Sequence, residues 1–215
     1  MGSGAGADAS AQRALALEPG NPENLKSAAS SAAILGRLDE AIQLSRRAVD
    51  LDPLNGSSWE SLGENEFFMG QLDQAAADSK KARELNPDVW PGPIQLSEIY
   101  LMQGRPQDAL AEIERIAYEP LRGCLHSIAY YALGRKRESD VTLSDFIAKY
   151  HTGYAYGIAR VYAFRNQSDE AFEWLDRAYD HRNSSLIETK VDPLLRSLHK
   201  DPRFAAFLKK LNLPN

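Results

Sequence analysis

One short pattern returns three times along this 215-residue chain at a constant interval. The segments QRALALEPGN, RRAVDLDPLN and KKARELNPDV begin at Gln12, Arg46 and Lys80, each 34 residues after the one before. In each segment, helix-forming residues run into a proline. A recurrence at fixed spacing is typical of architectures in which equivalent units stack on one another, so the repeat constrains the fold more than any local motif.

A 34-residue frame can be started at Pro22 and continued at Gly56 and Trp90. A glycine returns in the middle of each frame, and small residues return around its eighth, twentieth and twenty-seventh positions. The small residues are Ala29, Gly63 and Ser97; Ala41, Ala75 and Ala109; and Ala48, Ala82 and Ala117, and the glycines are Gly36, Gly70 and Gly104. Larger apolar residues lie three or four residues from these positions, which is the spacing of one helical face. Each frame therefore predicts two closely packed helices joined by a glycine turn.

The predicted helix ends carry suitable capping residues. Asn21, Asn55 and the Asn86-Pro87-Asp88 group supply side-chain acceptors and turn residues between helices. The second helix of each unit should stop before a proline, which has no amide hydrogen, and these prolines are Pro19, Pro53 and Pro87. Near the C-terminus, Asp192-Pro193 and Asp201-Pro202 each predict an N-cap followed by a first-turn proline, and Lys209 and Lys210 suit the last helical turn.

These residues resemble a known family. WESLG at Trp59 to Gly63, followed by Gly70, Ala75, Ala82 and Pro87, is similar to the tetratricopeptide repeat (TPR) signature. The resemblance implies an all-α fold, a TPR-type α-solenoid in which antiparallel helix pairs form a right-handed superhelix with C-terminal capping helices. The sequence departs from the pattern where the family prefers large aromatic residues, at Ser45, Glu66 and Ser79. We expect the packing at these positions to be looser or to be filled from elsewhere.

The frame also predicts the domain organisation. Residues 1–6 are expected to be a disordered cloning remnant, 7–21 the second helix of a truncated repeat, and 184–215 capping helices that cover the fifth repeat. The five repeats are expected at 22–55, 56–89, 90–119, 120–151 and 152–183, the fourth being degenerate. The half-repeat suggests that the chain was cut from a longer one, and its open end could stack on a second copy to give a homodimer.

The composition narrows the range of functions. The net charge is −5, which argues against a nucleic-acid partner because phosphate contacts need a concentrated basic face. No apolar run reaches the roughly 18 residues of a membrane span. The single cysteine, Cys124, fits a reducing compartment. We expect a cytoplasmic location, with the periplasm as the alternative if the parent chain has an upstream membrane span.

The sequence offers no arrangement typical of catalysis or metal binding. The four histidines, His126, His151, His181 and His199, show no metal-ligand spacing, and no glycine-rich phosphate loop is present. Cys124 and His126 point apart on a helix, so Cys124 is interpreted as a buried thiol. We therefore expect a protein that is not an enzyme and that uses no cofactor or metal.

The remaining candidate site is the concave wall formed by the first helices of the repeats. The stripe opposite their packing face is rich in apolar and aromatic residues, which indicates an interaction surface. Filling of gaps between neighbouring helices is the alternative for any one of them. The residues predicted to bind a peptide or helix of a protein partner are Glu60, Glu64, Phe68, Glu98, Met102, Tyr131, Tyr156, Arg160 and Phe164. The glutamates favour a partner segment with apolar anchors and a basic residue.

A second function remains open at this point. The stretch VDPLLRSLHKDPRFAAFLKKLNLP resembles the terminal segment of bacterial signalling proteins that carry TPRs after an effector domain. The resemblance implies that the chain could be the regulatory or sensory arm of a bacterial cyclase, kinase or transcription regulator, acting in cis or by self-association.

Overall fold

The computed structural model describes residues 4–87 and 92–214, and within these ranges all regular structure is helical. The helices are α1 (Gly4–Leu17), α2 (Pro22–Ile34), α3 (Leu38–Leu51), α4 (Gly56–Met69), α5 (Leu72–Leu85), α6 (Gly92–Met102), α7 (Pro106–Ile113), α8 (Glu119–Ala132), α9 (Lys136–Tyr150), α10 (Ala155–Phe164), α11 (Ser168–Asp180) and α12 (Pro202–Lys210), with 3-10 helices η1 (Ser184–Glu188) and η2 (Pro193–Leu198). The expected start of the third frame, Trp90, and the residue Asp88 lie outside the described residues. Of the expected disordered segment 1–6, residues 4–6 are described, and they form the first turn of α1.

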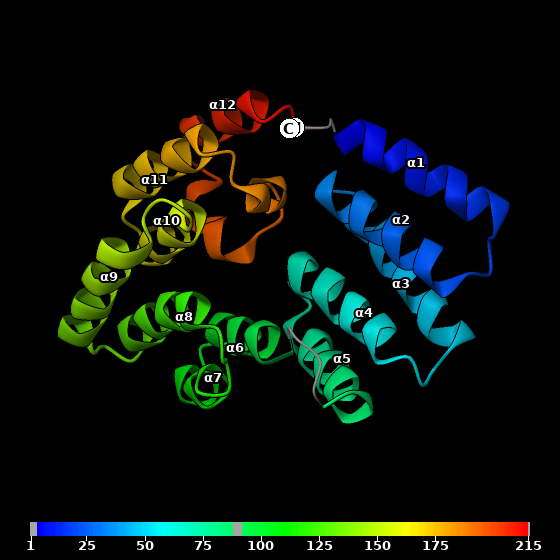
Figure 1. Ribbon diagram of the computed structural model, residues 1–215, viewed down its shortest axis with the longest axis horizontal. Helices are drawn as coiled ribbons and strands as arrows, with labels where there is room; N and C mark the ends of the chain where they lie inside the picture. The colour runs from blue at the N-terminus through cyan, green and yellow to red at the C-terminus, as the bar shows by residue number, and fades with distance from the viewer. Residues whose placement is uncertain (1–3, 88–91, 215) are drawn as a thin grey trace.

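Helices pair and stack in chain order, which is the arrangement of an α-solenoid. The pairs α2 with α3, α4 with α5, α6 with α7, α8 with α9 and α10 with α11 are in contact, and α1 packs on α2. Figure 1 shows the pairs following a curved path, and the contact of Lys190 with Leu35 joins the C-terminal part of this path to its N-terminal part. The molecule thus has the outline of an open ring, and this confirms the predicted solenoid.

The predicted turns and caps are confirmed. Gly36, Gly70, Gly104 and Gly134 have positive φ values, from 69° to 84°, which glycine adopts without a Cβ penalty. Asn166 takes the same position between α10 and α11 with φ 58°. At four predicted N-caps, the side chain accepts a hydrogen bond from a backbone amide of the helix that follows. These residues are Asn21, Asn55, Asp192 and Asp201. The helices α1, α3 and α5 each end two residues before a proline.

Small residues allow neighbouring helices to approach closely. Ala41, Ala75 and Ala109 have no exposed surface. A Cβ added to Gly63 would lie 2.7 Å from Ser79 Oγ, so this glycine is required by the contact between α4 and α5. One small-residue prediction was wrong: Ala117 is exposed, because α7 already ends at Ile113 and the following loop brings Ile116 into the core instead.

Buried polar contacts replace the aromatic residues of the family pattern. Ser45 of α3 and Ser79 of α5 are fully buried. Asn65 of α4 donates to Ser45 Oγ at 2.8 Å, and Ser79 Oγ donates to Gln95 Oε1 of α6 at 3.1 Å. Each serine is therefore satisfied by an amide side chain of the next repeat, and a buried polar group that is hydrogen-bonded in this way carries little desolvation penalty.

Glu66, which stands where the family prefers tyrosine, is also buried. Its Oε1 pairs with Arg46 of α3 at 3.0 Å, while its Oε2 is buried without a hydrogen-bond partner. Burial, and then the neighbouring carboxyl of Asp78 on α5, raise the pKa of Glu66 above its ordinary value. The junction of α3, α4 and α5 thus holds a carboxyl group that is costly to ionise.

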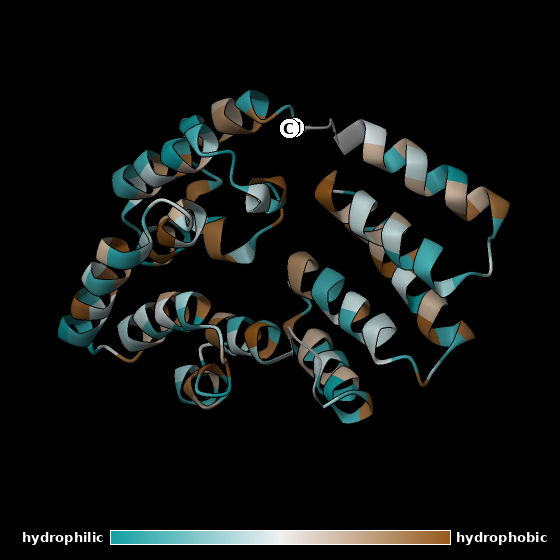
Figure 2. Cartoon of the chain, viewed as in Figure 1, coloured by the Kyte–Doolittle hydropathy of each residue, from teal (hydrophilic) through white to brown (hydrophobic). Residues whose placement is uncertain are grey.

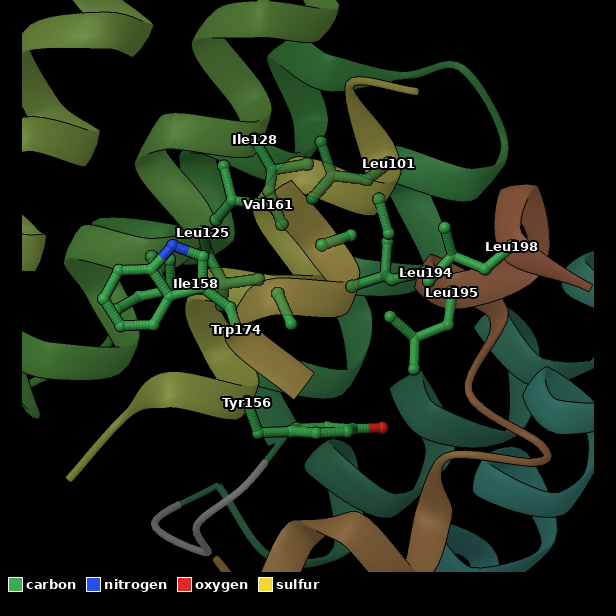
Figure 3. Packing of buried hydrophobic residues seen from close by; sticks show 14 of the residues in the cluster. Leu101, Leu125, Ile128, Tyr156, Ile158, Val161, Trp174, Leu194, Leu195 and Leu198 are labelled. Atoms are coloured by element: carbon green, nitrogen blue, oxygen red, sulfur yellow. The ribbon is translucent and has the colours of Figure 1, made fainter. Parts of the chain in front are cut away.

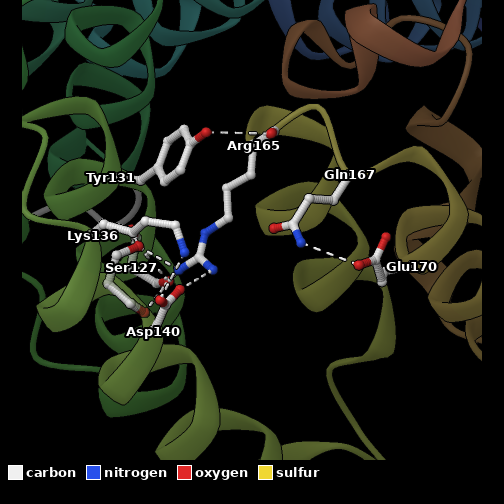
Figure 4. A network of polar contacts seen from close by, with 8 residues as sticks. Ser127, Tyr131, Lys136, Asp140, Arg165, Gln167 and Glu170 are labelled. Carbon is white, nitrogen blue, oxygen red and sulfur yellow. Dashed lines mark hydrogen bonds and ion pairs between the residues drawn. The ribbon is translucent and has the colours of Figure 1, made fainter.

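The degenerate fourth pair, α8 with α9, is held together by a side chain from the next pair (Figure 4). Arg165, which follows α10, is buried and directs its guanidinium between the two helices. It pairs with Asp140 at 2.9 Å and donates to the hydroxyls of Ser127 and Ser139, two further small residues at the helix contact. A charged hydrogen-bonded side chain therefore fills a junction where the repeat pattern is weakest.

The C-terminal segment divides between two sides of the ring. α12 covers α11 as expected, through ion pairs of Arg203 with Asp169 and of Lys210 with Asp176. The preceding turn η2 packs on α10, the first helix of the same repeat, and Figure 1 shows η1 and η2 on the inside of the curve. The segment 184–201 therefore occupies part of the surface that was expected to be open.

Hydrophobic and hydrophilic residues are interspersed along the helices (Figure 2). Within the described residues, no helix combines the length and apolar character needed to traverse a lipid bilayer.

The contact at Gly63 generates a stability prediction. Gly63→Val is expected to lower the free energy of unfolding by roughly 1–3 kcal/mol, because the added methyl groups meet Ser79 and the carbonyl of Ala75. Urea unfolding followed by circular dichroism measures the change. Gly153→Val is the control, since a Cβ there meets no atom within 4 Å. Equal destabilisation by the two variants would contradict the proposed close contact.

The buried carboxyl at Glu66 generates a pH prediction. A carboxyl group whose pKa is raised in the folded state holds its proton more tightly there than in the unfolded chain. Its contribution to stability therefore falls as the pH rises from its pKa in the unfolded chain to its pKa in the folded state. Glu66→Gln should therefore make the free energy of unfolding less dependent on pH between about pH 5 and pH 8. Glu84→Gln, at an exposed position of α5, should leave the dependence unchanged. Identical pH profiles for both variants would show that Glu66 is not the group responsible.

Candidate functional site: the inner face of the ring

The inner face is defined here as the surface formed by α2, α4, α6 and α10 together with the segment 184–201. Of the nine residues predicted to bind a partner, the structure brings Glu60, Glu64, Glu98, Tyr156 and Arg160 to this face, where charged groups of four elements interact. The segment 184–201 adds Glu188 and Asp192, which the repeat pattern did not identify.

Arg160 of α10 is the central cation of the inner face. Its Nη2 donates to Glu98 Oε1 of α6 at 2.8 Å, and its Nε lies 2.8 Å from Asp192 Oδ2, just before η2. Tyr156 Oη donates to the same Asp192 oxygen at 2.9 Å. Burial raises the pKa values of Glu98 and Tyr156, and Arg160 opposes both shifts. Two predicted partner-binding residues, Tyr156 and Arg160, thus contact the chain's own C-terminal segment directly, and Glu98 is joined to it through Arg160.

The leucines of η2 complete this attachment. Leu194, Leu195 and Leu198 are each 2% exposed or less. Figure 3 shows them beside Leu101 of α6 and close to Ile158 of α10. Full burial of a leucine side chain is worth about 2 kcal/mol relative to exposure, so removal of the segment from α10 would be strongly unfavourable. The segment is therefore part of the core on this side of the ring.

A group of carboxylates lies where the segment 184–201 faces α4. Glu64 of α4 has an exposed side chain, and the pKa of its carboxyl is raised to about 7 by desolvation and by Glu188, Glu60 and Glu98. Desolvation and Asp192 raise the pKa of Glu188 to about 7 as well. Desolvation also raises the pKa of Glu60, against the attraction of Lys26. We call Glu60, Glu64 and Glu188 the inner carboxylates.

The nearby cations are only partly available to balance these charges. Lys26 of α2 contacts Ser57 at 2.5 Å and Glu23 at 2.8 Å. Arg160 is committed to Glu98 and Asp192. Among the described contacts, no hydrogen bond or ion pair joins an inner carboxylate to a basic side chain, so a cationic group of a ligand could pair with these carboxylates without displacing one.

The predicted aromatic and apolar anchors are mostly packing residues. Phe68 is half-buried and packs against two apolar clusters, one of α2 and α3 and the other a larger cluster that extends from α4 to α12. Met102 and Phe164 are likewise half-buried against the larger cluster. Tyr131 donates to the carbonyl of Arg165 at 3.4 Å, and its ring lies under the Arg165 guanidinium (Figure 4). The structure does not gather these four side chains into one accessible patch with the inner carboxylates.

Cys124 is confirmed as a buried thiol. It is 2% exposed, and its Sγ donates to the carbonyl of Gly157 at 3.3 Å. Burial raises the pKa of its thiol to about 12. In the part of the chain that the structure describes, no three His, Cys, Asp or Glu side chains are grouped as metal ligands would be.

Sequence reasoning missed the residues that come from outside the repeats. Glu188 and Asp192 lie in a segment predicted only as helix caps, so their positions on the inner face could not be read from the 34-residue frame. The available signal was the Asp-Pro pair at 192–193 followed by two leucines, which indicates a capped turn with an apolar face. It does not indicate which side of the solenoid that face covers.

Comparison with known proteins supports the fold. A family model described as the tetratricopeptide repeat matches residues 1–56. No curated protein sequence matches the chain.

Solved structures cover nearly the whole chain at low identity. The thermophilic TPR protein TTC0263 of Thermus thermophilus has a TM-score of 0.60 and 21% identity over 88% of this chain and 100% of its own. A TPR protein of Parabacteroides merdae has a TM-score of 0.61 and 17% identity over 95% and 84%. YrrB, described as a TPR protein with an unusual peptide-binding site, has a TM-score of 0.53 and 16% identity over 93% and 97%. Together with the repeat match at residues 1–56, these likenesses show the fold, a TPR-type α-solenoid.

Proposed function

We propose that the chain is a non-enzymatic protein-interaction module that binds a basic polypeptide segment at the inner carboxylates. The TPR fold is a general protein–protein interaction module, and YrrB is a structural neighbour described as having a peptide-binding site. The observation that carries the proposal is the placing of three carboxyl groups, Glu60 and Glu64 of α4 and Glu188 of η1, without a direct ion pair to a basic side chain among the described contacts; desolvation is the main cause that raises their pKa values.

Each element of the site has a distinct part in this proposal. Glu60 and Glu64 come from successive turns of α4, so they face one side of a bound segment. Glu188 approaches from η1 on the other side. A lysine or arginine placed between them would be attracted by all three groups, in surroundings that screen charge less than bulk water does.

The segment 184–201 limits where such a ligand would lie. Because Asp192 and the η2 leucines fill the surface of α10, the ligand would contact mainly α2, α4 and the outward side of η1. The proposed contacts of Tyr156, Arg160 and Glu98 with a partner would then be indirect, since these residues position the segment that carries Glu188. Met102, Phe164, Phe68 and Tyr131 would support the surrounding helices rather than insert into a ligand.

The proposal is tested with a peptide library displayed on a solid support. Peptides retained by the chain are expected to contain lysine or arginine, and Glu60→Gln with Glu64→Gln should weaken their binding at least tenfold, as measured by isothermal titration calorimetry. The control replaces two exposed glutamates elsewhere, Glu18→Gln with Glu84→Gln, and should bind normally. Selection of acidic or uncharged apolar peptides, or equal affinity of both double variants, would overturn the proposal.

Binding should also depend on pH. The pKa values of Glu64 and Glu188 are about 7, so these groups are largely protonated below that pH and ionised above it. Affinity for a lysine-containing peptide is therefore expected to rise between about pH 6 and pH 8, with protons released on binding. Calorimetry in two buffers of different ionisation enthalpy measures the release. A flat pH profile with no proton release would contradict the role of these carboxylates.

A further inference from the structure

Two basic side chains of the C-terminal segment reach across the ring to the N-terminal helices. Lys190 Nζ lies 3.5 Å from the carbonyl oxygen of Leu35, and its Cε lies 2.7 Å from the position of a Cβ on Gly36. Nη2 of Arg196 lies 3.1 Å from the corresponding position on Gly70. Gly36 and Gly70 are the turn residues that follow α2 and α4 in successive repeats. The segment thus contacts two equivalent points of the solenoid.

Both contact points favour a cation. The last carbonyl groups of a helix lack partners within the helix, and the aligned peptide dipoles give that end partial negative charge. Gly70 itself has φ 84°, and at both glycines the missing side chain leaves room for the basic group to approach the backbone. The contacts are therefore made by flexible side chains against helix ends, whereas η2 packs through its leucines on α10.

Repulsion between carboxylates opposes these contacts of the C-terminal segment with the N-terminal helices. Glu188 of η1 faces Glu64 of α4, and Glu98 of α6 and Glu60 of α4 add to the negative potential at Glu64. The pKa of Glu188 is also raised by Asp192 of its own segment, while the attraction of Arg160 on α10 lowers it. Lys26 of α2 acts on Glu60. Attraction at the helix ends and repulsion between carboxylates therefore act between the same two parts of the chain.

We infer that Lys190 and Arg196 form a latch that holds the ring closed against repulsion between Glu188 and Glu64, and that the inner face opens when the latch is removed or the carboxylates ionise. Opening separates α2 and α4 from the segment 184–201, which stays on α10 through Asp192 and the η2 leucines. This inference goes beyond the proposed function, because it rests on contacts within the free chain and its test needs no ligand.

The test measures distances between pairs of spin labels on introduced cysteines. Asp39→Cys at the start of α3 and Lys200→Cys after η2 report across the ring, and both positions are exposed. Asp39→Cys with Gln74→Cys on α5 reports within the N-terminal half. Cys124 is buried with its thiol pKa raised to about 12, so labels react with the introduced thiols.

The latch predicts a specific pattern of distances. The cross-ring distance should lengthen or broaden between about pH 6 and pH 8.5, and Lys190→Ala with Arg196→Ala should lengthen it further at pH 8.5, where the carboxylates are ionised. Glu64→Gln with Glu188→Gln should keep the short distance at both pH values. The α3 to α5 distance should not change, which separates opening of the ring from loss of folding.

A matched control removes two positive charges away from the inner face. Arg13→Ala with Lys209→Ala, both at exposed positions, should retain the cross-ring distance of the unaltered chain. A cross-ring distance that is the same for the latch variant, the control and the unaltered chain would overturn the inference. A distance that changes equally in latch and control variants would overturn it too, because net charge rather than the two contacts would then govern the opening.

Discussion

The inner face depends on one largely buried cation. Arg160 joins Glu98 of α6 to Asp192 before η2, and Tyr156 adds a hydrogen bond to the same aspartate. Burying these charges is favourable only while each has its partners, so loss of one member would leave the others desolvated and unpaired. Arg160 therefore fixes the path of the C-terminal segment, and with it the position of Glu188 relative to α4.

This interaction also explains why the apolar character of the inner stripe was misleading. An exposed apolar surface usually indicates a docking site, and the predicted stripe is indeed apolar. In the structure, however, Leu101, Leu125 and Ile128 are buried in the same cluster as the η2 leucines. The stripe is matched by a segment of the same chain, and what remains at the inner surface is charge.

The sequence predicted the features that repeat and could not predict those that occur once. Helix ends followed from residues such as Asn55 and Gly70, because caps and turns need specific residue types at fixed positions. The buried polar contacts between repeats could not be predicted in this way, because the partners of Asn65 and Arg165 lie in other repeats and no local pattern identifies them. Likewise, a capped turn at Asp192 is a local property. Its place on α10 depends on Arg160, which no local pattern connects to it.

The distribution of the core gives the two halves of the ring different resistance to opening. In a solenoid each repeat contacts mainly its neighbours, so local packing sets local stability. The C-terminal helices share one large apolar cluster, to which η2 contributes Leu194, Leu195 and Leu198. The helices α2 and α3 contribute only to two small clusters of alanines and a few branched residues, whereas α4 and α5 also add Phe67, Ala75 and Ala76 to the large cluster. Fewer buried apolar contacts mean a lower cost of local rearrangement, so a change of charge at the inner carboxylates should move the N-terminal helices, α2 above all, rather than the segment that faces them.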